Sequence, residues 1–139
     1  MIFMEKNCRN EDISELLKIA RDKLKYCYSP YSNIRVISVL KTDGGLYYGV
    51  NIENASYGLT ICAERVAIFK AISEGQKNFQ CILVYSPDVK PIPCGACLQV
   101  IREFSSPDLP IIIAFGNKPI QIEKYLLKDL LPVTFSIKS

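Results

Sequence analysis

The chain has 139 residues, with 17 Lys and Arg against 14 Asp and Glu, which gives a formal net charge of +3. Hydrophobic residues make up 49% and charged residues 22%, and these proportions exclude an intrinsically disordered chain. The absence of histidine excludes a Ser–His–Asp triad, a Cys–His pair and any histidine metal ligand. We expect a single domain over residues 1–139, because the length is typical of one domain and no linker-like tract interrupts it.

The first half of the chain predicts a helix followed by a β-hairpin. Apolar residues recur at helical spacing over residues 10–25, which indicates an amphipathic helix. A turn at residues 29–33 leads into two strand patterns, residues 34–41 and 46–52. The Asp-Gly-Gly sequence at residues 43–45 is typical of a hairpin turn, so we expect these strands to pair.

The second half alternates helix and strand patterns. In chain order we predict a helix over residues 62–73, a strand over 80–85, a helix over 95–104, a strand over 109–115 and a short helix over 122–130. Strands that are joined through a helix run parallel, so part of the sheet is expected to be parallel. Together the elements indicate the α/β class, with helices layered on a sheet.

Three of the six cysteines open predicted helices: Cys62 begins one, and Cys94 and Cys97 form a Cys-x-x-Cys pair at another. A helix N-terminus favours thiolates, and three thiolates make a trigonal base for Zn²⁺ that leaves one position open to water. Taken singly, the pair is also typical of a redox site and Cys62 of a buried small side chain, but their joint occurrence favours a metal site. We interpret the other three cysteines as structural: Cys8, Cys27 and Cys81.

Two charged residues follow Cys62 in the first turn of its predicted helix. Glu64 is placed to reach across a metal site toward a water molecule, as a general acid and base must, although the helix dipole alone also favours a carboxylate there. Three thiolates on Zn²⁺ leave a net charge of −1, and Arg65 can offset it by a hydrogen bond to a thiolate. An ordinary solvated arginine is the alternative interpretation.

Asn51 and Glu53 lie two positions apart where the second predicted strand ends, and side chains at this spacing on extended backbone face the same side. An amide beside a carboxylate suits a sugar hydroxyl, because one group donates a hydrogen bond and the other accepts one. A polar strand edge is the alternative. The strand edge is the preferred interpretation of these two residues alone, although their position just before Cys62 allows a role in substrate binding.

Four sequence blocks resemble the small homotetrameric zinc-dependent cytidine deaminases. They are NIENASY from Asn51, CAER from Cys62, PCGAC from Pro93 and LLPVTF from Leu130, and the resemblance covers about residues 13–135. It implies a three-layer α/β/α sandwich around a five-stranded mixed sheet. It also implies hydrolytic deamination of cytidine and deoxycytidine to uridine and deoxyuridine plus ammonia, in cytoplasmic pyrimidine salvage.

The resemblance assigns roles to individual residues of this chain. Zinc is held by the three cysteines named above, and Glu64 moves protons between the attacking water, the pyrimidine ring and the leaving amine. Asn51 and Glu53 hold the ribose 3′-hydroxyl, the Ala63 backbone contacts the base edge, and the Ile92 carbonyl receives the leaving amine.

Three further positions resemble residues that act on a neighbouring subunit, so the resemblance implies a homo-oligomer, a tetramer in this family. Ala55 and Tyr57 match positions that reach the sugar's 5′ side, and Phe135 matches an aromatic that closes a neighbour's pocket. The chain departs from the family at three positions. Ile34 stands where the family has an aromatic residue that packs on the base, Ile37 where it usually has glycine, and Leu98 where it usually has a basic residue. These departures put the preferred pyrimidine in question.

Other functions need features that differ from those of a nucleoside deaminase. A related deaminase of another cytosine-bearing small molecule would account for Ile34 and Ile37, and a structural zinc module would need a fourth thiol, for which Cys81 is nearest in sequence. Nucleic acid is disfavoured as a partner because the basic residues form no dense run. We expect neither a membrane partner nor a secretory leader, since residues 109–115 are too few to span a bilayer and Glu5 interrupts the start.

Overall fold

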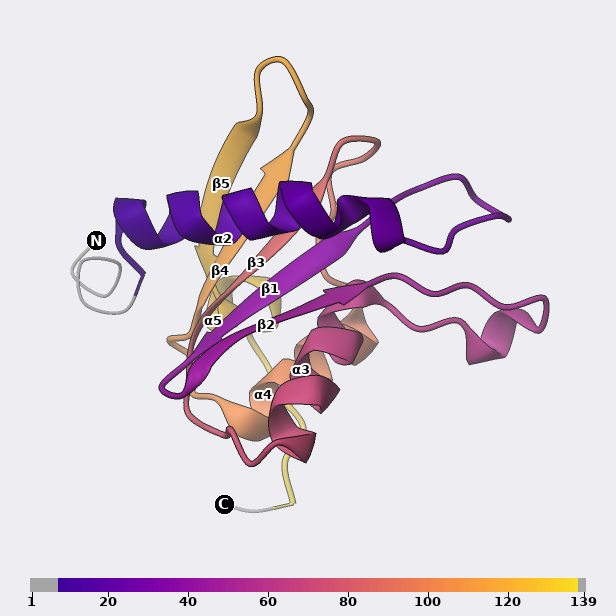
Figure 1. Ribbon diagram of the computed structural model, residues 1–139. Helices are drawn as coiled ribbons and strands as arrows, with labels where there is room; N and C mark the ends of the chain where they lie inside the picture. Colours follow the sequence, from indigo (N-terminus) through magenta and orange to yellow (C-terminus); the bar gives the residue numbers. More distant parts are fainter. Residues whose placement is uncertain (1–7, 138–139) are drawn as a thin grey trace.

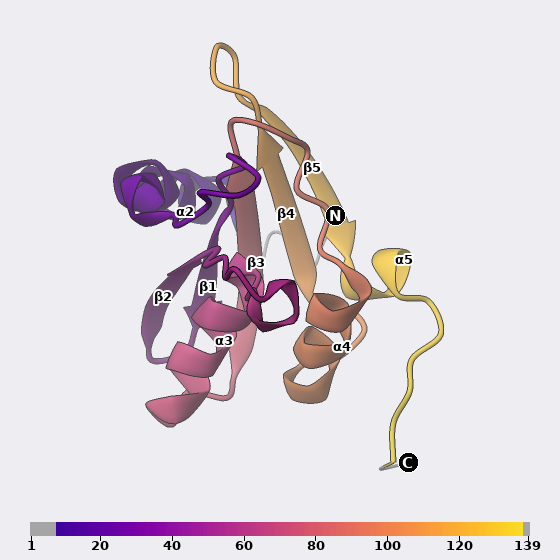
Figure 2. The ribbon, with the colours of Figure 1, turned by 90° about the vertical axis from the view of Figure 1, so that its right-hand side faces the viewer.

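The structure is a computed structural model that describes residues 8–137. In chain order the elements are α2 (Asn10–Lys23), η1 (Leu24–Tyr26), β1 (Ile37–Thr42), β2 (Gly45–Val50), η2 (Tyr57–Leu59), α3 (Ala63–Ser73), β3 (Phe79–Ser86), α4 (Gly95–Phe104), β4 (Pro110–Phe115), β5 (Gln121–Leu126) and α5 (Leu127–Leu130). Figure 1 shows the strands as one sheet, and Figure 2 shows α2 on one of its faces and α3 and α4 on the other. The three-layer α/β/α sandwich is confirmed.

The sheet has five strands in the order β2-β1-β3-β4-β5. β1 pairs antiparallel with both β2 and β3, β3 pairs parallel with β4, and β4 pairs antiparallel with β5. The parallel pair is the one whose strands are joined through helix α4, as expected of a crossover connection. The sheet is therefore mixed, as the resemblance implies.

Each face of the sheet packs against its own helices. On the face covered by α2, Leu16 and Ala20 lie in one buried cluster with strand residues such as Val39 and Leu83. On the opposite face, Ile68 of α3 and Ile101 of α4 lie in a second cluster, which includes alternate strand residues such as Leu40, Ile82 and Val84. This alternation buries both faces and holds α3 and α4 rigidly on one side of the sheet.

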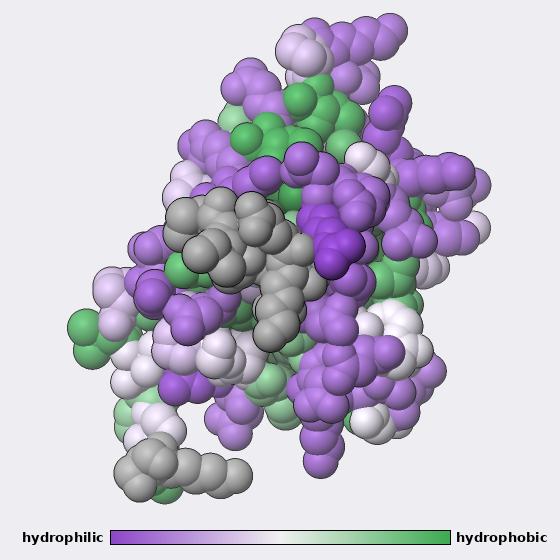
Figure 3. Space-filling model, turned by 90° about the vertical axis from the view of Figure 1, so that its left-hand side faces the viewer, coloured by the Kyte–Doolittle hydropathy of each residue, from purple (hydrophilic) through white to green (hydrophobic). Residues whose placement is uncertain are grey.

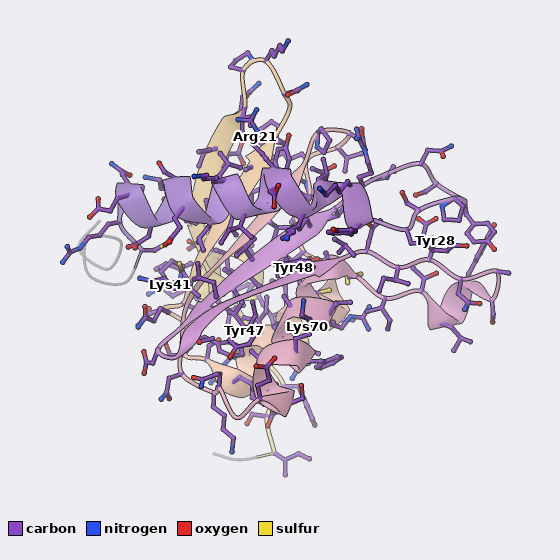
Figure 4. The ribbon with its side chains drawn as sticks, viewed as in Figure 1. Arg21, Tyr28, Lys41, Tyr47, Tyr48 and Lys70 are labelled. Carbon is purple, nitrogen blue, oxygen red and sulfur yellow. The ribbon has the colours of Figure 1, made fainter. Side chains whose placement is uncertain are left out.

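Helix α3 approaches strand β2 unusually closely at Gly49. A Cβ atom there would lie 2.3 Å from the Ala67 backbone nitrogen and 2.5 Å from the Ala63 carbonyl oxygen, so only glycine fits. Farther along the helix, the Lys70 ammonium lies 3.8 Å from the centroid of the Tyr48 ring, and Figure 4 shows this pair bridging α3 and β2. These contacts place the first turn of α3 against the sheet.

The segment over residues 122–130 was expected to be a helix, and this prediction was wrong. Residues 121–126 form β5, and only residues 127–130 form a helical turn. Without β5, strand β4 would leave a row of backbone N–H and C=O groups unpaired. Pairing along the whole of β4, from Gln121 opposite Phe115 to Leu126 opposite Pro110, outweighs the helical spacing of the apolar residues.

The first two strands are shorter than the sequence patterns indicated. Residues 34–36 precede β1, and residues 51–52 follow β2. The Asn51 amide explains the early end, because its Nδ2 donates to the Ile34 carbonyl at 2.7 Å and its Oδ1 accepts from the Val36 N–H at 3.1 Å. A side chain thus takes the place of the strand ladder at this end of the sheet.

Among residues 8–137, no helix is both long and apolar enough to cross a membrane. Figure 3 shows one side of the molecule, where hydrophilic residues predominate and apolar residues form separate areas.

Candidate metal centre

The metal-site cysteines lie at the starts of two neighbouring helices. Cys62 is the N-cap residue of α3, Cys94 is the N-cap residue of α4, and Cys97 lies in the first turn of α4. The Sγ atoms of Cys62 and Cys94 are 3.9 Å apart, and those of Cys94 and Cys97 are 3.5 Å apart. All three sulfurs lie within 4.8 Å of one another, and among the described residues this is the one group of three or more potential metal ligands.

These sulfur positions fit a zinc ion. Zn–S bonds of about 2.3 Å in tetrahedral geometry place two ligand sulfurs about 3.8 Å apart, close to the separations found here. All six cysteines are free thiols, so the three remain available as ligands. A donor set made of thiolates selects zinc over magnesium or calcium. Cys94 is exposed and Cys62 only half-buried, so the cluster is accessible from solvent.

Arg65 supports the negative charge of the cluster. Its Nη2 lies 3.5 Å from the Cys62 Sγ, in donor geometry. Hydrogen bonds from Cys97 and Arg65 lower the pKa of the Cys62 thiol to about 5, although partial burial acts in the opposite direction. Of the two interpretations of Arg65, the geometry supports the sulfur contact.

Glu64 is buried beside the sulfurs, with 4% of its surface exposed. Burial raises the pKa of its carboxyl to about 7, and the neighbouring Cys62 thiolate acts in the same direction. A carboxyl that titrates near neutral pH is suited to accept and return a proton during a reaction.

A cavity of about 280 Å³ opens at this cluster. Cys62, Cys94, Ala63 and Glu64 all line it, so the metal group and the buried carboxyl face the same space. The other lining residues come from the ends of β1 and β2 and from the two loops that precede the cysteines: Val36, Asn51, Thr60, Ile61, Val89, Lys90, Pro91 and Ile92. The volume and the mixed apolar and polar lining suit a small molecule.

Asn51 and Glu53 both bind the turn that precedes β1. The Glu53 carboxylate accepts hydrogen bonds from the backbone N–H groups of Tyr31 and Ser32, at 2.9 and 3.1 Å, and from the Ser32 hydroxyl. The Ser32 hydrogen bonds hold the pKa of Glu53 below its ordinary value, so it is an anion at neutral pH. Glu53 lines a shallow hollow that adjoins the main cavity through Thr60.

The comparison with known proteins identifies the family. Residues 10–113 match the family described as "Cytidine and deoxycytidylate deaminase zinc-binding region". The chain belongs to this family.

Individual relatives agree with that assignment over most of the chain. The chain is 42% identical to the cytidine deaminase of Halalkalibacterium halodurans, over 90% of this chain and 95% of the relative. It is 39% identical to the cytidine deaminase of Sporosarcina psychrophila, over 90% and 92%. The crystal structure of cytidine deaminase from Burkholderia pseudomallei superposes with a TM-score of 0.80 at 38% identity, covering 88% of this chain and 98% of that one.

With the family known, the metal is zinc, and the cluster of Cys62, Cys94 and Cys97 is positioned to bind it. The structure does not support a closed four-cysteine site. Cys81 lies in the buried cluster under α2, on the face of the sheet opposite α3 and α4, and next to Cys8. Cys27 is half-buried, and its thiol donates to the Val36 carbonyl at 3.3 Å.

The structure brings together some of the expected substrate contacts and leaves others apart. Asn51, Ala63 and Ile92 line the main cavity, while Glu53 and Tyr57 line the adjoining hollow. Ala55 lines neither space and is exposed. Phe135 is 71% exposed, and its carbonyl oxygen accepts a hydrogen bond from Gln99 Nε2 on α4.

The departures from the family pattern fall in different places. Ile37 is buried on the α2 face, away from the cavity, and Leu98 is buried between α4 and the sheet. Ile34 is half-buried and contributes its carbonyl to the Asn51 amide. None of these three side chains lines the main cavity, so each acts on packing rather than by direct contact there.

The sequence did not reveal that the loop before Cys94 forms a wall of the cavity. Val89, Lys90 and Pro91 line it, and Asp88 binds Arg35 from the opposite wall. The proline-rich sequence of residues 87–93 identifies a loop. A pairing over 53 positions has no local signal in a single sequence.

Proposed function

We propose that this chain hydrolyses cytidine and deoxycytidine to uridine and deoxyuridine with release of ammonia. The observation that carries the proposal is that the buried carboxyl of Glu64 opens into the same cavity as the Cys62 and Cys94 sulfurs. The family match and the cytidine deaminase relatives support the choice of reaction.

The three cysteines would hold zinc, which supplies Lewis-acid activation of a water molecule when it is bound. Arg65 balances the charge of the ligand set through its contact with Cys62 at 3.5 Å. The N-termini of α3 and α4 add further positive potential at the same point.

Glu64 carries the proton. Its carboxylate accepts one from the attacking water and delivers it to N3 of the pyrimidine as the water oxygen bonds to C4. It then takes the second proton from that oxygen and passes it to the amine, which leaves C4 as ammonia while the C4–O bond becomes the carbonyl of the product. Burial favours the protonated carboxyl, which makes the Glu64 carboxylate a stronger base toward the attacking water. Ile92 lines the cavity, and its carbonyl would accept a hydrogen bond from the departing amine.

Asn51 and Glu53 are proposed to hold the sugar. Asn51 uses its Oδ1 and one N–H on the Val36 and Ile34 backbone, which leaves its second N–H for a ribose hydroxyl. Glu53 keeps acceptor capacity beyond its bonds to Tyr31 and Ser32. The Ala63 backbone lies in the cavity wall, where it can contact the base edge.

The functional unit is proposed to be a homotetramer of single-domain chains that works in cytoplasmic pyrimidine salvage. Tyr57 is 77% exposed and Phe135 is 71% exposed, and large aromatic side chains at such exposure favour burial against another subunit. Ala55, exposed nearby, would act with them. Light scattering on the purified protein measures the assembly: a mass of four chains supports the proposal, and a monomer contradicts it.

A substrate panel tests the reaction. Zinc-loaded protein is incubated with cytidine, deoxycytidine, free cytosine and a cytosine-bearing single-stranded oligonucleotide, and loss of cytosine absorbance is measured together with ammonia. We expect turnover of the two nucleosides alone. Full zinc without turnover of either nucleoside would contradict the proposal, and activity on the oligonucleotide alone would indicate a nucleic-acid editing enzyme.

A further inference from the structure

The candidate substrate cavity has two walls that come from distant parts of the sequence. The turn segment, residues 31–36, supplies Val36, and the β3–α4 loop, residues 87–93, supplies residues 89–92. The base and sugar of a nucleoside would lie between them if the proposed function holds. The separation of these walls therefore decides how well a substrate is held.

The backbone of the turn segment is held by the side chains of Asn51 and Glu53. Asn51 binds the backbone on both sides of Arg35, through the Ile34 carbonyl at 2.7 Å and the Val36 N–H at 3.1 Å. Glu53 binds the earlier part of the same segment. The backbone that carries Arg35 is therefore held in place before its side chain makes any contact.

The β3–α4 loop is anchored at its start. The hydroxyl of Ser86, which is fully buried, accepts hydrogen bonds from the backbone N–H groups of Asp88 and Val89, at 3.1 and 3.2 Å. Farther along, Lys90 lies 2.8 Å from a Glu123 oxygen on β5. This second ion pair ties the loop to the far edge of the sheet and not to the turn segment.

Arg35 and Asp88 join the two walls. The guanidinium donates to both oxygens of the carboxylate, from Nε to Oδ2 at 3.0 Å and from Nη2 to Oδ1 at 2.9 Å. The Arg35 backbone N–H also donates to Oδ2, at 2.9 Å. A bidentate pair with a third hydrogen bond sets orientation as well as distance, unlike a single contact between flexible side chains. Among the described residues, it is the ion pair that connects these two segments.

We propose that Arg35 and Asp88 are positioning residues that set the width of the substrate cavity. Neither side chain lines the cavity, and each acts through the residue beside it: Arg35 through Val36, and Asp88 through Val89. The pair holds the loop that leads to Ile92 and Cys94 against the turn segment. It determines how tightly a nucleoside is bound without taking part in the chemistry.

The test combines kinetics with amide exchange on the zinc-loaded protein. Arg35→Ala and Asp88→Ala are each expected to raise KM for cytidine about fivefold and to leave kcat within about twofold, since lost positioning weakens binding of substrate and transition state alike. The double variant should match the Asp88→Ala variant, because two residues that act as one unit give non-additive effects. Arg35→Lys keeps the positive charge but loses the bidentate guanidinium, so its KM for cytidine should lie between those of the parent and Arg35→Ala.

Hydrogen exchange without substrate tests the same claim independently of the reaction. In Arg35→Ala, the amides of Asp88 and Val89 should exchange faster than in the parent. Lys128→Ala is the matched control, because it removes a 3.0 Å ion pair with Asp108 outside the cavity and should change neither KM nor exchange at the loop. Parental exchange rates in Arg35→Ala, or an unchanged KM in both single variants, would overturn the positioning role. A parent that does not deaminate cytidine would overturn the proposed function instead.

Discussion

In four helices of this molecule, the third helical residue contacts the N-cap residue, but the contact has two different roles. In α2 and α5, the third helical residue is an aspartate that binds back to the N-cap: Asp12 accepts from the Arg9 N–H and Asp129 from the Leu126 N–H, both at 2.8 Å. In α3 and α4, the N-cap is a cysteine without a side-chain cap bond. The third helical residues there are Arg65 and Cys97, and both reach back to the N-cap sulfur.

This difference shows how the site is built from ordinary helix geometry. A side chain at the third helical position naturally lies near the N-cap. When that side chain is a carboxylate, it satisfies the backbone and stabilises the helix. When it is Cys97 or Arg65, the same geometry brings the sulfurs and a guanidinium together, the groups proposed to hold zinc and to balance its ligand charge. The amides at the starts of α3 and α4 are then free to stabilise negative charge.

Removal of a sulfur from a helix start should have the largest effect. Cys97→Ala should abolish zinc binding and lower the thermal unfolding midpoint together, because metal binding and folding are coupled. Cys81→Ala, a buried cysteine on the other face of the sheet, should keep the parental zinc content. Metal analysis and thermal unfolding of both variants measure this. Full zinc in Cys97→Ala would refute its assignment as a ligand.

The next largest effect concerns the contact that holds α3 against the sheet. Gly49→Ala should lower the free energy of unfolding by about 2–3 kcal/mol, because its Cβ has no space beside Ala63 and Ala67. A Cβ atom at Gly58 would meet nothing within 4 Å beyond its chain neighbours, so Gly58→Ala should be close to neutral. Urea unfolding of the two variants compares them. Equal stabilities would show that α3 can shift without cost.

A smaller effect is expected from the counter-charge at the third position of α3. Arg65→Gln should lower kcat/KM for cytidine about tenfold with zinc retained, because a charge-assisted hydrogen bond to Cys62 is lost. Arg21→Gln on α2, which Figure 4 places on the other side of the sheet, serves as the control. Parental kinetics in Arg65→Gln would show that the helix termini alone balance the cluster.

The smallest effect belongs to a capping carboxylate. The Arg9 N–H and Lys41 hold the pKa of Asp12 below its ordinary value of 3.8. The stability that the ionised carboxylate contributes to the folded state is therefore complete above pH 3.8, and it is lost as the pH falls through the lowered pKa. Asp12→Ala should therefore cost about 1 kcal/mol at pH 7 and less at pH 2. Unfolding of parent and variant at both values checks this. A cost that does not change with pH would rule out a contribution from the charge.

Much of this arrangement follows from local sequence signals. The helical spacing of residues 10–25 predicted α2 to within two residues, and the Asp-Gly-Gly turn predicted the hairpin of β1 and β2. The cysteine spacing predicted one metal cluster at two helix starts, which the structure brings together. These features are local, or depend on residue types whose chemistry is specific.

The remaining features depend on partners that are distant in sequence. Residues 121–126 form a strand because β4 needs a partner, which the spacing of their own side chains does not reveal. Asn51 ends the hairpin strands through bonds to residues 15 and 17 positions earlier. The pair of Arg35 and Asp88 spans 53 positions. Sequence patterns describe each segment, but tertiary contacts decide between its alternatives.

The most direct test of the account compares the parent with Glu64→Gln on cytidine, with zinc measured in both. The substitution keeps size and hydrogen bonding but removes proton transfer, so turnover should fall by at least about a hundredfold while each protein holds about one zinc per chain. A Glu64→Gln variant that keeps full zinc and turns over within about tenfold of the parent would contradict the account, since another group would then carry the proton.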